Sequence, residues 1–349
     1  MVGRKRKSRK KKKPSAAPII LTVLAVILLT AGVGAWAVLA PFGPAQETFV
    51  EVPNGSSTAR IGQLLEVAGI VRTQYAFELV RFWKRGTLRA GEYRFDHPTT
   101  VSEIYSRIAH GDVFTRTVTI PEGSTIFDVA ARLEQAGLGP RKDFLDAAAQ
   151  QTSLVSDLDP GATTLEGYLF PDTYHFARKA TPEQICAIMV RRFRAIAAQE
   201  GLTRNLHEAV TLASLIERET AVEGERPIVA SVFENRLAKN MPLMTDPAVI
   251  YGLQAAGQWR GAIYASDLKD PKHDTPYNTY RHSGLPPGPV GNPGFASLRA
   301  ALHPAATDYL YFVATGADPQ GKSRFAATLD EHNKNVASYR KAIKQAGGR

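Results

Sequence analysis

The chain has 349 residues, and its apolar and charged fractions of 44% and 22% are those of ordinary globular proteins, which excludes wholesale disorder. Its formal charge of +10 is concentrated in residues 4–13, and the rest of the chain is close to neutral, so charge gives no indication of a nucleic-acid-binding domain. The single cysteine, Cys186, excludes an intramolecular disulfide, and its apolar surroundings at helical spacing favour a buried structural thiol.

Residues 18–40 are predicted to form a transmembrane helix, because they carry no charge and roughly 20 apolar residues suffice to cross the hydrocarbon core. The basic tail, residues 1–17, precedes this segment. The positive-inside rule therefore places the tail in the cytoplasm and the chain after Pro41 outside it, as in a single-pass protein of the cytoplasmic (inner) membrane. The alternative is a signal peptide cleaved after residues 35–37, although the apolar run is longer than a usual signal core. Both interpretations export the remaining chain.

An internal repeat with an offset of 68 residues follows a short Pro/Gly linker at residues 41–47. The copies read VEVPNGSSTARIGQLLEVAGI at residues 50–70 and VTIPEGSTIFDVAARLEQAGL at residues 118–138. Each copy predicts a strand, a Pro-x-Gly turn, a Ser/Thr helix cap, an amphipathic helix and an Ala-Gly C-cap.

The repeat predicts two small α+β modules. The membrane-proximal module spans residues 48–115 and also contains a strand at 91–95 and a helix at 100–109. The second module spans residues 116–160. Because TIPEGST precedes its helix, this module resembles a LysM module, a common binder of N-acetylglucosamine polymers. A purely structural spacer is the alternative.

Residues 161–345 are predicted to form one mixed α+β catalytic domain, so the expected fold class of the exported chain is α+β. A loop-rich region dense in Gly, Pro, Asn and Tyr lies between its regular elements. The pattern predicts helices at 182–200, 205–220, 225–239 and 331–345 and a buried strand at 309–313.

Two glutamates, Glu217 and Glu219, lie near the end of the mostly apolar segment AVTLASLIERETA. On a helix, Leu215 and Ile216 share one face with Glu219. Glu217 points about 160° away from that face. Apolar surroundings disfavour an ionised carboxyl and raise its pKa, as a general acid working near neutral pH requires. From the helix alone, two ordinary solvated acids near a helix end are also possible.

Polar and aromatic motifs accompany this helix: LEGYLFPDTY, TDP, YNTY and GLPPG. Tyr, Asn, Asp and Thr in loops are typical of a carbohydrate cleft. The segments LASLIERET, SVFENRL, MTDPAVIYG, YNTY, GLPPGPVGNPG, ALHPA and YLYFVA follow one another in the order seen in the MltG (YceG-like) family of endolytic murein transglycosylases. The chain resembles this family from its apolar N-terminal segment onward.

The resemblance implies that Glu219, the second Glu of Glu-x-Glu-Thr, is the catalytic acid of a peptidoglycan lytic transglycosylase. One Glu would protonate the oxygen between N-acetylmuramic acid (MurNAc) and N-acetylglucosamine (GlcNAc). It would then accept the proton of the muramoyl 6-hydroxyl, closing a 1,6-anhydro ring without water. Glu217 would be a supporting or solvated residue. The residues expected to line the sugar subsites or hold Glu219 are Glu166, Glu217, Asp246, Tyr277, Asn278 and Tyr280.

The implied partners are peptidoglycan glycan strands, the membrane and the peptidoglycan synthesis machinery, with no nucleic acid. No cofactor is implied. No metal is expected either, because His273, His282, His303 and His332 lack a ligand spacing such as H-E-x-x-H. The alternatives are a membrane-tethered peptidoglycan binder without catalysis, a hydrolytic muramidase, and a pyridoxal-phosphate lyase. The last would need a Lys within an apolar stripe, which the sequence of the C-terminal domain lacks.

Overall fold

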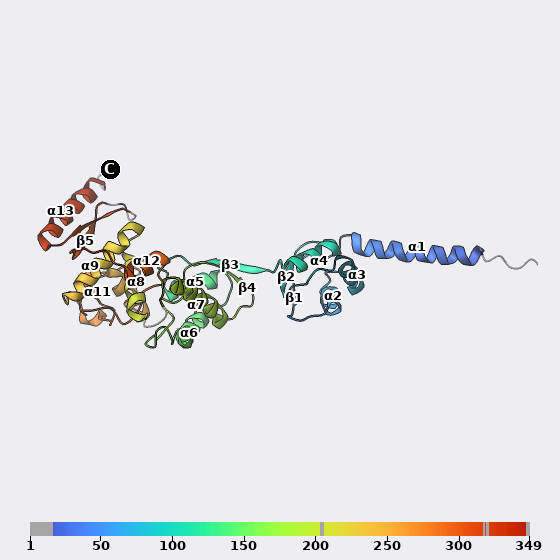
Figure 1. Ribbon diagram of the computed structural model, residues 1–349, viewed down its shortest axis with the longest axis horizontal. Coiled ribbons are helices and arrows are strands. Elements are labelled where there is room, and N and C mark those ends of the chain that lie inside the picture. The colour runs from blue at the N-terminus through green and yellow to red at the C-terminus, as the bar shows by residue number, and fades with distance from the viewer. Residues whose placement is uncertain (1–16, 203–205, 317, 319–320, 347–349) are drawn as a thin grey trace, which may run out of the picture. The chain divides into compact units, whose positions relative to one another are not determined.

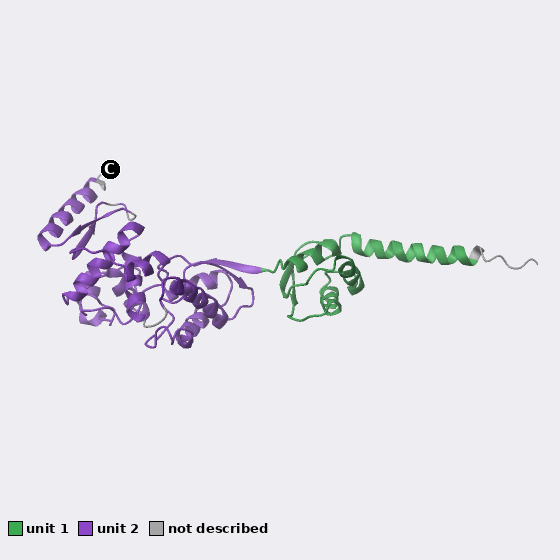
Figure 2. Cartoon of the chain, viewed as in Figure 1, with its two compact units in different colours: residues 1–114 green, residues 115–349 purple. Residues whose placement is uncertain are grey.

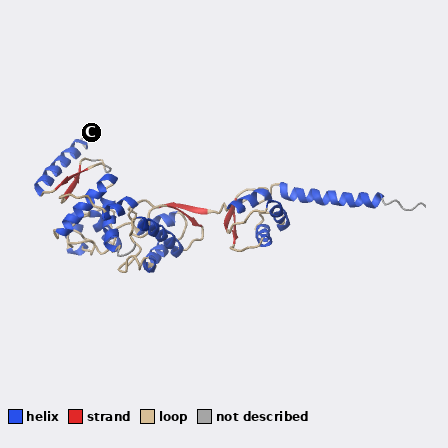
Figure 3. Cartoon of the chain, in the orientation of Figure 1, coloured by secondary structure: helices blue, strands red, loops and turns tan. Residues whose placement is uncertain are grey.

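The computed structural model describes most of the chain, namely residues 17–202, 206–316, 318 and 321–346. The predicted basic tail, up to residue 16, lies outside them. The chain divides into two compact units, residues 1–114 and residues 115–349 (Figure 2). The predicted mixture of helices and strands behind one apolar N-terminal helix is confirmed (Figure 3).

The first unit begins with α1 (Ala17–Leu39), and among the described residues this is the one helix long and apolar enough to cross a membrane. The predicted linker that follows is fastened to the rest of the unit. The Phe42 backbone pairs with Thr99, and the Arg72 guanidinium donates to the Ala40 carbonyl oxygen at 2.9 Å. The end of α1 is therefore tied to the folded part of the first unit.

The folded part of the first unit has the order β-α-α-β-α. Its strands pair antiparallel, with Val50 opposite Tyr93, and its core is built around the buried Phe77, Tyr93 and Ile104. The elements are β1 (Thr48–Val52), α2 (Thr58–Val67), α3 (Gln74–Lys84), β2 (Gly91–Phe95) and α4 (Val101–His110) (Figure 1).

The second unit opens with the same order of elements. They are β3 (Thr115–Thr119), α5 (Ile126–Gln135), α6 (Arg141–Gln150), β4 (Thr173–Ala177) and α7 (Pro182–Gln199). Here β3 pairs antiparallel with β4, as β1 pairs with β2. A longer connection, which contains η1 (Thr152–Leu154), separates α6 from β4. The predicted sequence repeat is therefore part of a longer structural repeat of five elements.

The two copies of the repeat also agree in their helix caps. Ser57 caps α2 and Thr125 caps α5, and each side chain accepts a hydrogen bond from the backbone N–H three residues on. After these helices Gly69 and Gly137 have φ angles of 69° and 71°, a left-handed conformation that glycine adopts without steric cost. The predicted caps at both ends of the repeated helix are confirmed.

Beyond α7 the second unit consists of helices and one hairpin. They are α8 (His207–Glu219), η2 (Glu223–Glu225), α9 (Arg226–Ala238), α10 (Asp246–Ala255), α11 (Ala265–Lys269), η3 (Pro271–His273), α12 (Phe295–Leu302), β5 (Tyr311–Ala314), β6 (Ser323–Ala326) and α13 (Leu329–Ala346).

The long predicted helices correspond to α7, α8, α9 and α13, and the predicted strand corresponds to β5, which is half-buried rather than buried. The predicted loop-rich region also contains α10, α11 and α12. The clearest of these from sequence is α10, because Asp246-Pro247 followed by apolar residues is a common helix start.

One hydrophobic core joins the repeated elements of the second unit to its later helices. It includes Leu133 of α5, Phe193 of α7 and Leu215 of α8. Since β3 pairs with β4, the chain division predicted at residue 160 falls inside a single compact unit. The second copy of the repeat is consequently available to support helix α8.

We expect Leu133→Ala to lower the free energy of unfolding by about 2–5 kcal/mol, because it leaves a cavity at a side chain that is 2% exposed. Gln135→Ala, at an exposed position on the same helix, should change it by no more than about 0.5 kcal/mol. Urea unfolding of the two variants followed by circular dichroism measures both values. Equal effects would contradict the position of α5 in the common core.

Candidate active site

Helix α8 is embedded in the second unit along most of its length. Val210, Leu215 and Ile216 are fully buried. The Ser214 hydroxyl accepts a hydrogen bond from the Val290 backbone N–H at 3.0 Å and donates to the Thr211 carbonyl oxygen at 2.7 Å. Two buried polar groups are thereby satisfied, and the C-terminal end of α8 is held in one place.

Glu217 is a buried structural carboxylate. Its two oxygens accept from Arg226 Nη2 at 2.8 Å and from the Gly294 backbone N–H at 2.9 Å, and its side chain is 5% exposed. The solvated carboxylate that the sequence left open is therefore not observed, and a supporting role for Glu217 stays a prediction. Glu217 is not among the residues that line the cavity next to Glu219.

Glu219 is the last residue of α8, and its side chain borders a cavity of about 320 Å³. No described group hydrogen-bonds its carboxyl. Burial and the negative charge of Asp246 raise the pKa of Glu219 to about 8, against the opposing charges of Arg236 and Arg218. The carboxyl also lies at a helix C-terminus, where the helix dipole disfavours negative charge. Burial, the Asp246 charge and the helix dipole therefore all favour the protonated form of Glu219.

The cavity is formed by segments that are far apart in the sequence. Helices α9 and α10, the loop between them, the hairpin strand β5 and the first turn of α13 all contribute to its wall. Besides Glu219, the lining residues are Phe233, Arg236, Leu243, Met244, Thr245, Asp246, Tyr280, Phe312 and His332. Of the predicted subsite residues, Asp246 and Tyr280 therefore lie with Glu219.

Asp246 and Tyr280 form a direct pair, in which the Tyr280 hydroxyl donates to Asp246 Oδ1 at 2.7 Å. Met244, two residues before Asp246, has a φ of 52°, and its N–H donates to the Thr279 carbonyl oxygen at 3.1 Å. A left-handed conformation is strained for a non-glycine residue, and such strain is common at functional sites. The hydrogen bond from Met244 to Thr279 of the YNTY segment therefore fixes the backbone just before α10.

Arg236 was missed by sequence reasoning, although it belongs to the SVFENRL motif. Its guanidinium donates to the carbonyl oxygens of Leu310 and Leu243, at 2.7 and 2.8 Å. It thus joins α9 to the segment before β5 and to the loop before α10. Burial lowers the pKa of Arg236 below its usual value. The side chain still supplies positive charge next to Glu219.

His332 is another lining residue whose place in the site was not predicted. Its ring stacks on Tyr311 with 5.1 Å between ring centroids, and burial and the Arg236 charge lower its pKa. In the part of the chain that the structure describes, no three His, Cys, Asp or Glu side chains form a group suited to holding a metal ion.

Glu166 lies in the core, outside the lining of the Glu219 cavity, and is 2% exposed. Its carboxyl accepts from the Ile126 backbone N–H at 2.9 Å and from Asn292 Nδ2 at 3.0 Å. Burial raises the pKa of Glu166 to about 8 in spite of these hydrogen bonds. Glu166 therefore connects the start of α5 to the GNPG loop.

Tyr277 and Asn278 also lie outside the lining of the Glu219 cavity. The Tyr277 ring packs edge-on against Tyr251, with 4.9 Å between centroids. Asn278 is fully buried, donates to the Asp267 carbonyl oxygen at 3.2 Å and accepts from the Tyr280 N–H at 3.1 Å. Asn278 accordingly orients the loop that carries Tyr280.

A carboxyl with a raised pKa, no hydrogen-bond partner among the described residues and access to a polar cavity makes Glu219 the candidate for general acid–base catalysis. The profile of the YceG-like family matches residues 50–338. The chain therefore belongs to the YceG-like family.

Several relatives are similar over most of the chain. An endolytic murein transglycosylase of Bacillus subtilis (strain 168) is 33% identical over 312 residues, which cover 83% of this chain and 84% of the relative. One from Streptococcus pneumoniae serotype 2 (strain D39 / NCTC 7466) is 32% identical over 325 residues, covering 83% and 58%. A 2.6 Å crystal structure of a YceG-like protein from Listeria monocytogenes is 33% identical, has a TM-score of 0.53, and is matched over 83% of this chain and 99% of that one.

We expect Glu166→Ala to destabilise the protein, because it removes the acceptor of the Ile126 N–H and one of the two acceptors of the Asn292 amide, which also donates to the Ser124 carbonyl oxygen. Each orphaned buried donor costs about 1–3 kcal/mol. Glu219→Gln should not lower the stability, because no described group hydrogen-bonds the Glu219 carboxyl. Urea unfolding measures both effects. A Glu166→Ala variant that keeps its stability and loses substrate affinity instead would make Glu166 a substrate-binding residue.

Proposed function

We propose that this protein is an endolytic peptidoglycan lytic transglycosylase. It would cleave the β-1,4 bond between MurNAc and GlcNAc and leave 1,6-anhydroMurNAc ends. The observation that carries the proposal is the Glu219 carboxyl, which has a raised pKa, lacks a hydrogen-bond partner among the described residues and borders a cavity. The printed names of the Bacillus and Streptococcus relatives support murein as the substrate.

Glu219 acts twice in the proposed reaction. The protonated carboxyl gives its proton to the glycosidic oxygen while the bond from this oxygen to C1 of MurNAc breaks, and GlcNAc leaves with a hydroxyl group. The ionised carboxylate then takes the proton from the 6-hydroxyl of the same MurNAc, whose O6 forms a new bond to C1. The proton returns to Glu219 and no water is consumed, so the product is an anhydro ring.

Asp246 is assigned a supporting role in this scheme. A glycosidase with two catalytic carboxylates would use the second one as nucleophile or as the base for water. One oxygen of Asp246 is already engaged by the Tyr280 hydroxyl, and the Asp246 charge raises the pKa of Glu219. We therefore assign Asp246 to keeping Glu219 protonated, and to favouring the positive charge that develops on the sugar ring.

The second copy of the repeat supports α8 in this proposal. The Gly123 N–H donates to the Asn292 carbonyl oxygen at 2.8 Å, and Arg218 Nη1 donates to the Gly123 carbonyl oxygen at 3.2 Å. The turn of TIPEGST is thus occupied by contacts within the second unit. These contacts favour a structural role for this segment over the sugar-binding role of a LysM module.

We also propose that α1 spans the membrane with the N-terminus in the cytoplasm and the remaining chain outside. The cluster of basic residues at 4–13, ahead of α1, supports this orientation. Anchored there, the enzyme would act on nascent glycan strands, close to the peptidoglycan synthesis machinery.

We expect Glu219→Gln to lower the rate of glycan cleavage by at least about 10²–10⁴-fold, because the amide can neither donate nor accept the required proton. Glu208→Gln, at an exposed acid on the same helix, is the matched control and should retain full activity. Digestion of purified sacculi followed by mass spectrometry of the product ends measures the rate and identifies the reaction. Reducing MurNAc ends would indicate a hydrolytic muramidase, and full activity of Glu219→Gln would exclude Glu219 as the acid.

The pH dependence of cleavage should reveal the pKa of Glu219. A general acid is active while protonated, so the rate should fall as the pH rises through about 8. Asp246→Asn removes the negative charge that favours the proton and keeps an acceptor for Tyr280, so the fall in rate should move to lower pH. Rate profiles of the wild type and Asp246→Asn test this. An unchanged profile would mean that Asp246 does not act on Glu219.

A further inference from the structure

Helix α3 of the first unit presents large apolar side chains to its surroundings. The exposed fractions are 69% for Tyr75, 47% for Leu79, 67% for Phe82 and 77% for Trp83. Their spacing of four, seven and eight residues from Tyr75 places all four on one face of the helix. A contiguous apolar face of this kind marks a surface that meets a partner or a membrane.

The internal repeat provides a matched comparison for this face. Helix α6 occupies the same place in the second copy. When the two helices are aligned at their first residues, Gln74 and Arg141, Phe77 of α3 corresponds to Phe144 of α6, and both are buried. At the positions that are exposed in both helices, Tyr75, Leu79, Phe82 and Trp83 of α3 correspond to Lys142, Asp146, Ala149 and Gln150 of α6. The fold therefore does not require apolar residues there, and the surroundings of α3 must account for them.

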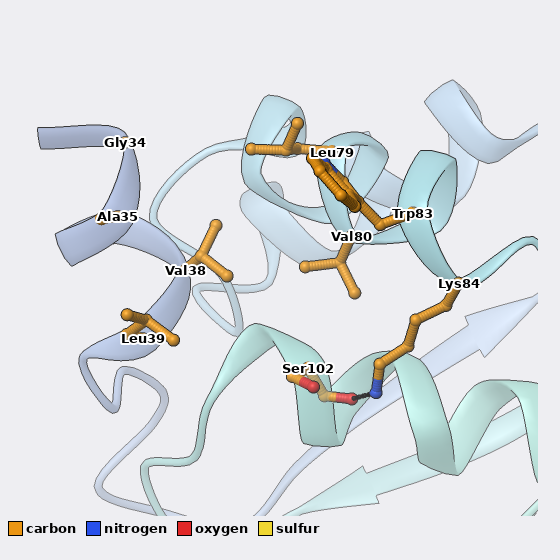
Figure 4. A pocket seen from close by; sticks show the side chains of 9 residues that line it. All are labelled: Gly34, Ala35, Val38, Leu39, Leu79, Val80, Trp83, Lys84 and Ser102. Carbon is orange, nitrogen blue, oxygen red and sulfur yellow. Dashed lines mark hydrogen bonds between the residues drawn. The ribbon is translucent and has the colours of Figure 1, made fainter. Parts of the chain in front are cut away.

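The apolar face of α3 adjoins the end of helix α1. A groove of about 460 Å³ lies between the two helices (Figure 4). Val38 and Leu39 of α1 border one side, and Leu79, Val80 and Trp83 of α3 border the other. Lys84 lies at its polar end, where its ammonium donates to the Ser102 carbonyl oxygen and to the Ser106 hydroxyl.

The depth of α3 relative to α1 can be derived from the residues that share the groove. The α1 residues that line it run from Gly34 to Leu39, the last six of the helix. At about 1.5 Å per residue they cover about 8 Å of the helix axis. Interfacial amphipathic helices bury their apolar faces by about 5–10 Å, so α3 lies at the depth of an interfacial helix if α1 spans the bilayer.

We propose that α3 lies in the membrane–water interface of the leaflet in which α1 ends, and that acyl chains of that leaflet fill the groove between the two helices. This inference rests on the proposed membrane-spanning role of α1. Two features support it. The groove is continuous with the lipid-facing surface of α1. The exposed Tyr75 and Trp83 are also of the residue types enriched at membrane interfaces.

The basic end of α3 fits the same position. Arg81 and Lys84 occupy its last turn, and Arg85 caps it with its guanidinium over the Phe82 ring. Positive charge beside a row of aromatic residues suits a surface of anionic headgroups over acyl chains. Arg72, which precedes α3, contacts the end of α1. Its guanidinium donates to the Ala40 carbonyl oxygen and lies over the Trp36 ring, with 4.0 Å from Cζ to the ring centroid. The pair α1–α3 is therefore held as one membrane-binding element.

Tryptophan fluorescence tests the proposal on the full chain in phospholipid vesicles. Trp36→Phe with Trp259→Phe leaves Trp83 as the reporter, and Trp83→Phe with Trp259→Phe leaves Trp36 on α1 as the reporter of the anchor. Gln150→Trp in a background without the three native tryptophans provides the matched aqueous reference on α6. We expect brominated acyl chains to quench Trp83 as they quench Trp36, with emission shifted to shorter wavelength and acrylamide quenching well below that of Gln150→Trp.

Three outcomes would overturn the inference. Quenching of Trp36 by brominated lipid, with Trp83 as accessible to acrylamide as Gln150→Trp, would place α3 in water and leave the anchor intact. Protection of Trp83 from both quenchers would mean that protein, such as a second copy of this chain, covers the face. Absence of lipid quenching at Trp36 itself would exclude the membrane-spanning role of α1 and with it the position of α3.

Discussion

The proposed chemistry depends on burying the C-terminal turn of α8, because burial raises the pKa of the Glu219 carboxyl. Glu217 is buried against partners, because its carboxyl accepts from Arg226 and from the Gly294 N–H. Glu219, two residues later, is partly buried without such partners, and an unpaired carboxyl in that environment retains its proton. The two glutamates of one helix turn therefore differ in what each carboxyl contacts: Glu217 is paired with Arg226, and Glu219 is the proposed proton donor.

Segments from distant parts of the chain keep that turn in place, so the second unit has to fold as a whole to form the site. Asn292 donates to the carboxyl of Glu166, which also holds the first turn of α5. The turn at Gly123 accepts from Arg218, next to both glutamates. Every one of these groups is polar and lies in or at the edge of the core, so losing one leaves its partner unsatisfied. The YceG-like motifs far from Glu219 are explained in part by this requirement.

Local patterns were enough to predict the helices, caps and strands of the repeat and the apolar face of α8. The 3.6-residue period and the Ser/Thr and Gly caps act within one element. The lining of the cavity could not be derived in this way. Tyr277 and Asn278 belong to the same short motif as Tyr280, yet only Tyr280 reaches the cavity. Arg236 lines it from another helix, since its role depends on carbonyl groups at Leu243 and Leu310. Such contacts arise from tertiary packing, which no single motif encodes.

Comparing the two copies of the repeat distinguishes the residues that the shared fold requires from those that depend on the surroundings of each copy. Both copies keep the buried Phe, the helix cap and the left-handed glycine, because those positions build the same core in each. The exposed positions diverge. In the second copy, the turn before α5 contacts α8 through the hydrogen bond between Gly123 and Arg218, and the exposed face of α6 is polar. In the first copy, the corresponding helix α3 exposes aromatic side chains and adjoins α1. Since the two copies share one backbone arrangement, the divergence of their surfaces reflects two environments: one copy supports the acid, and the apolar face of the other is suited to lipid.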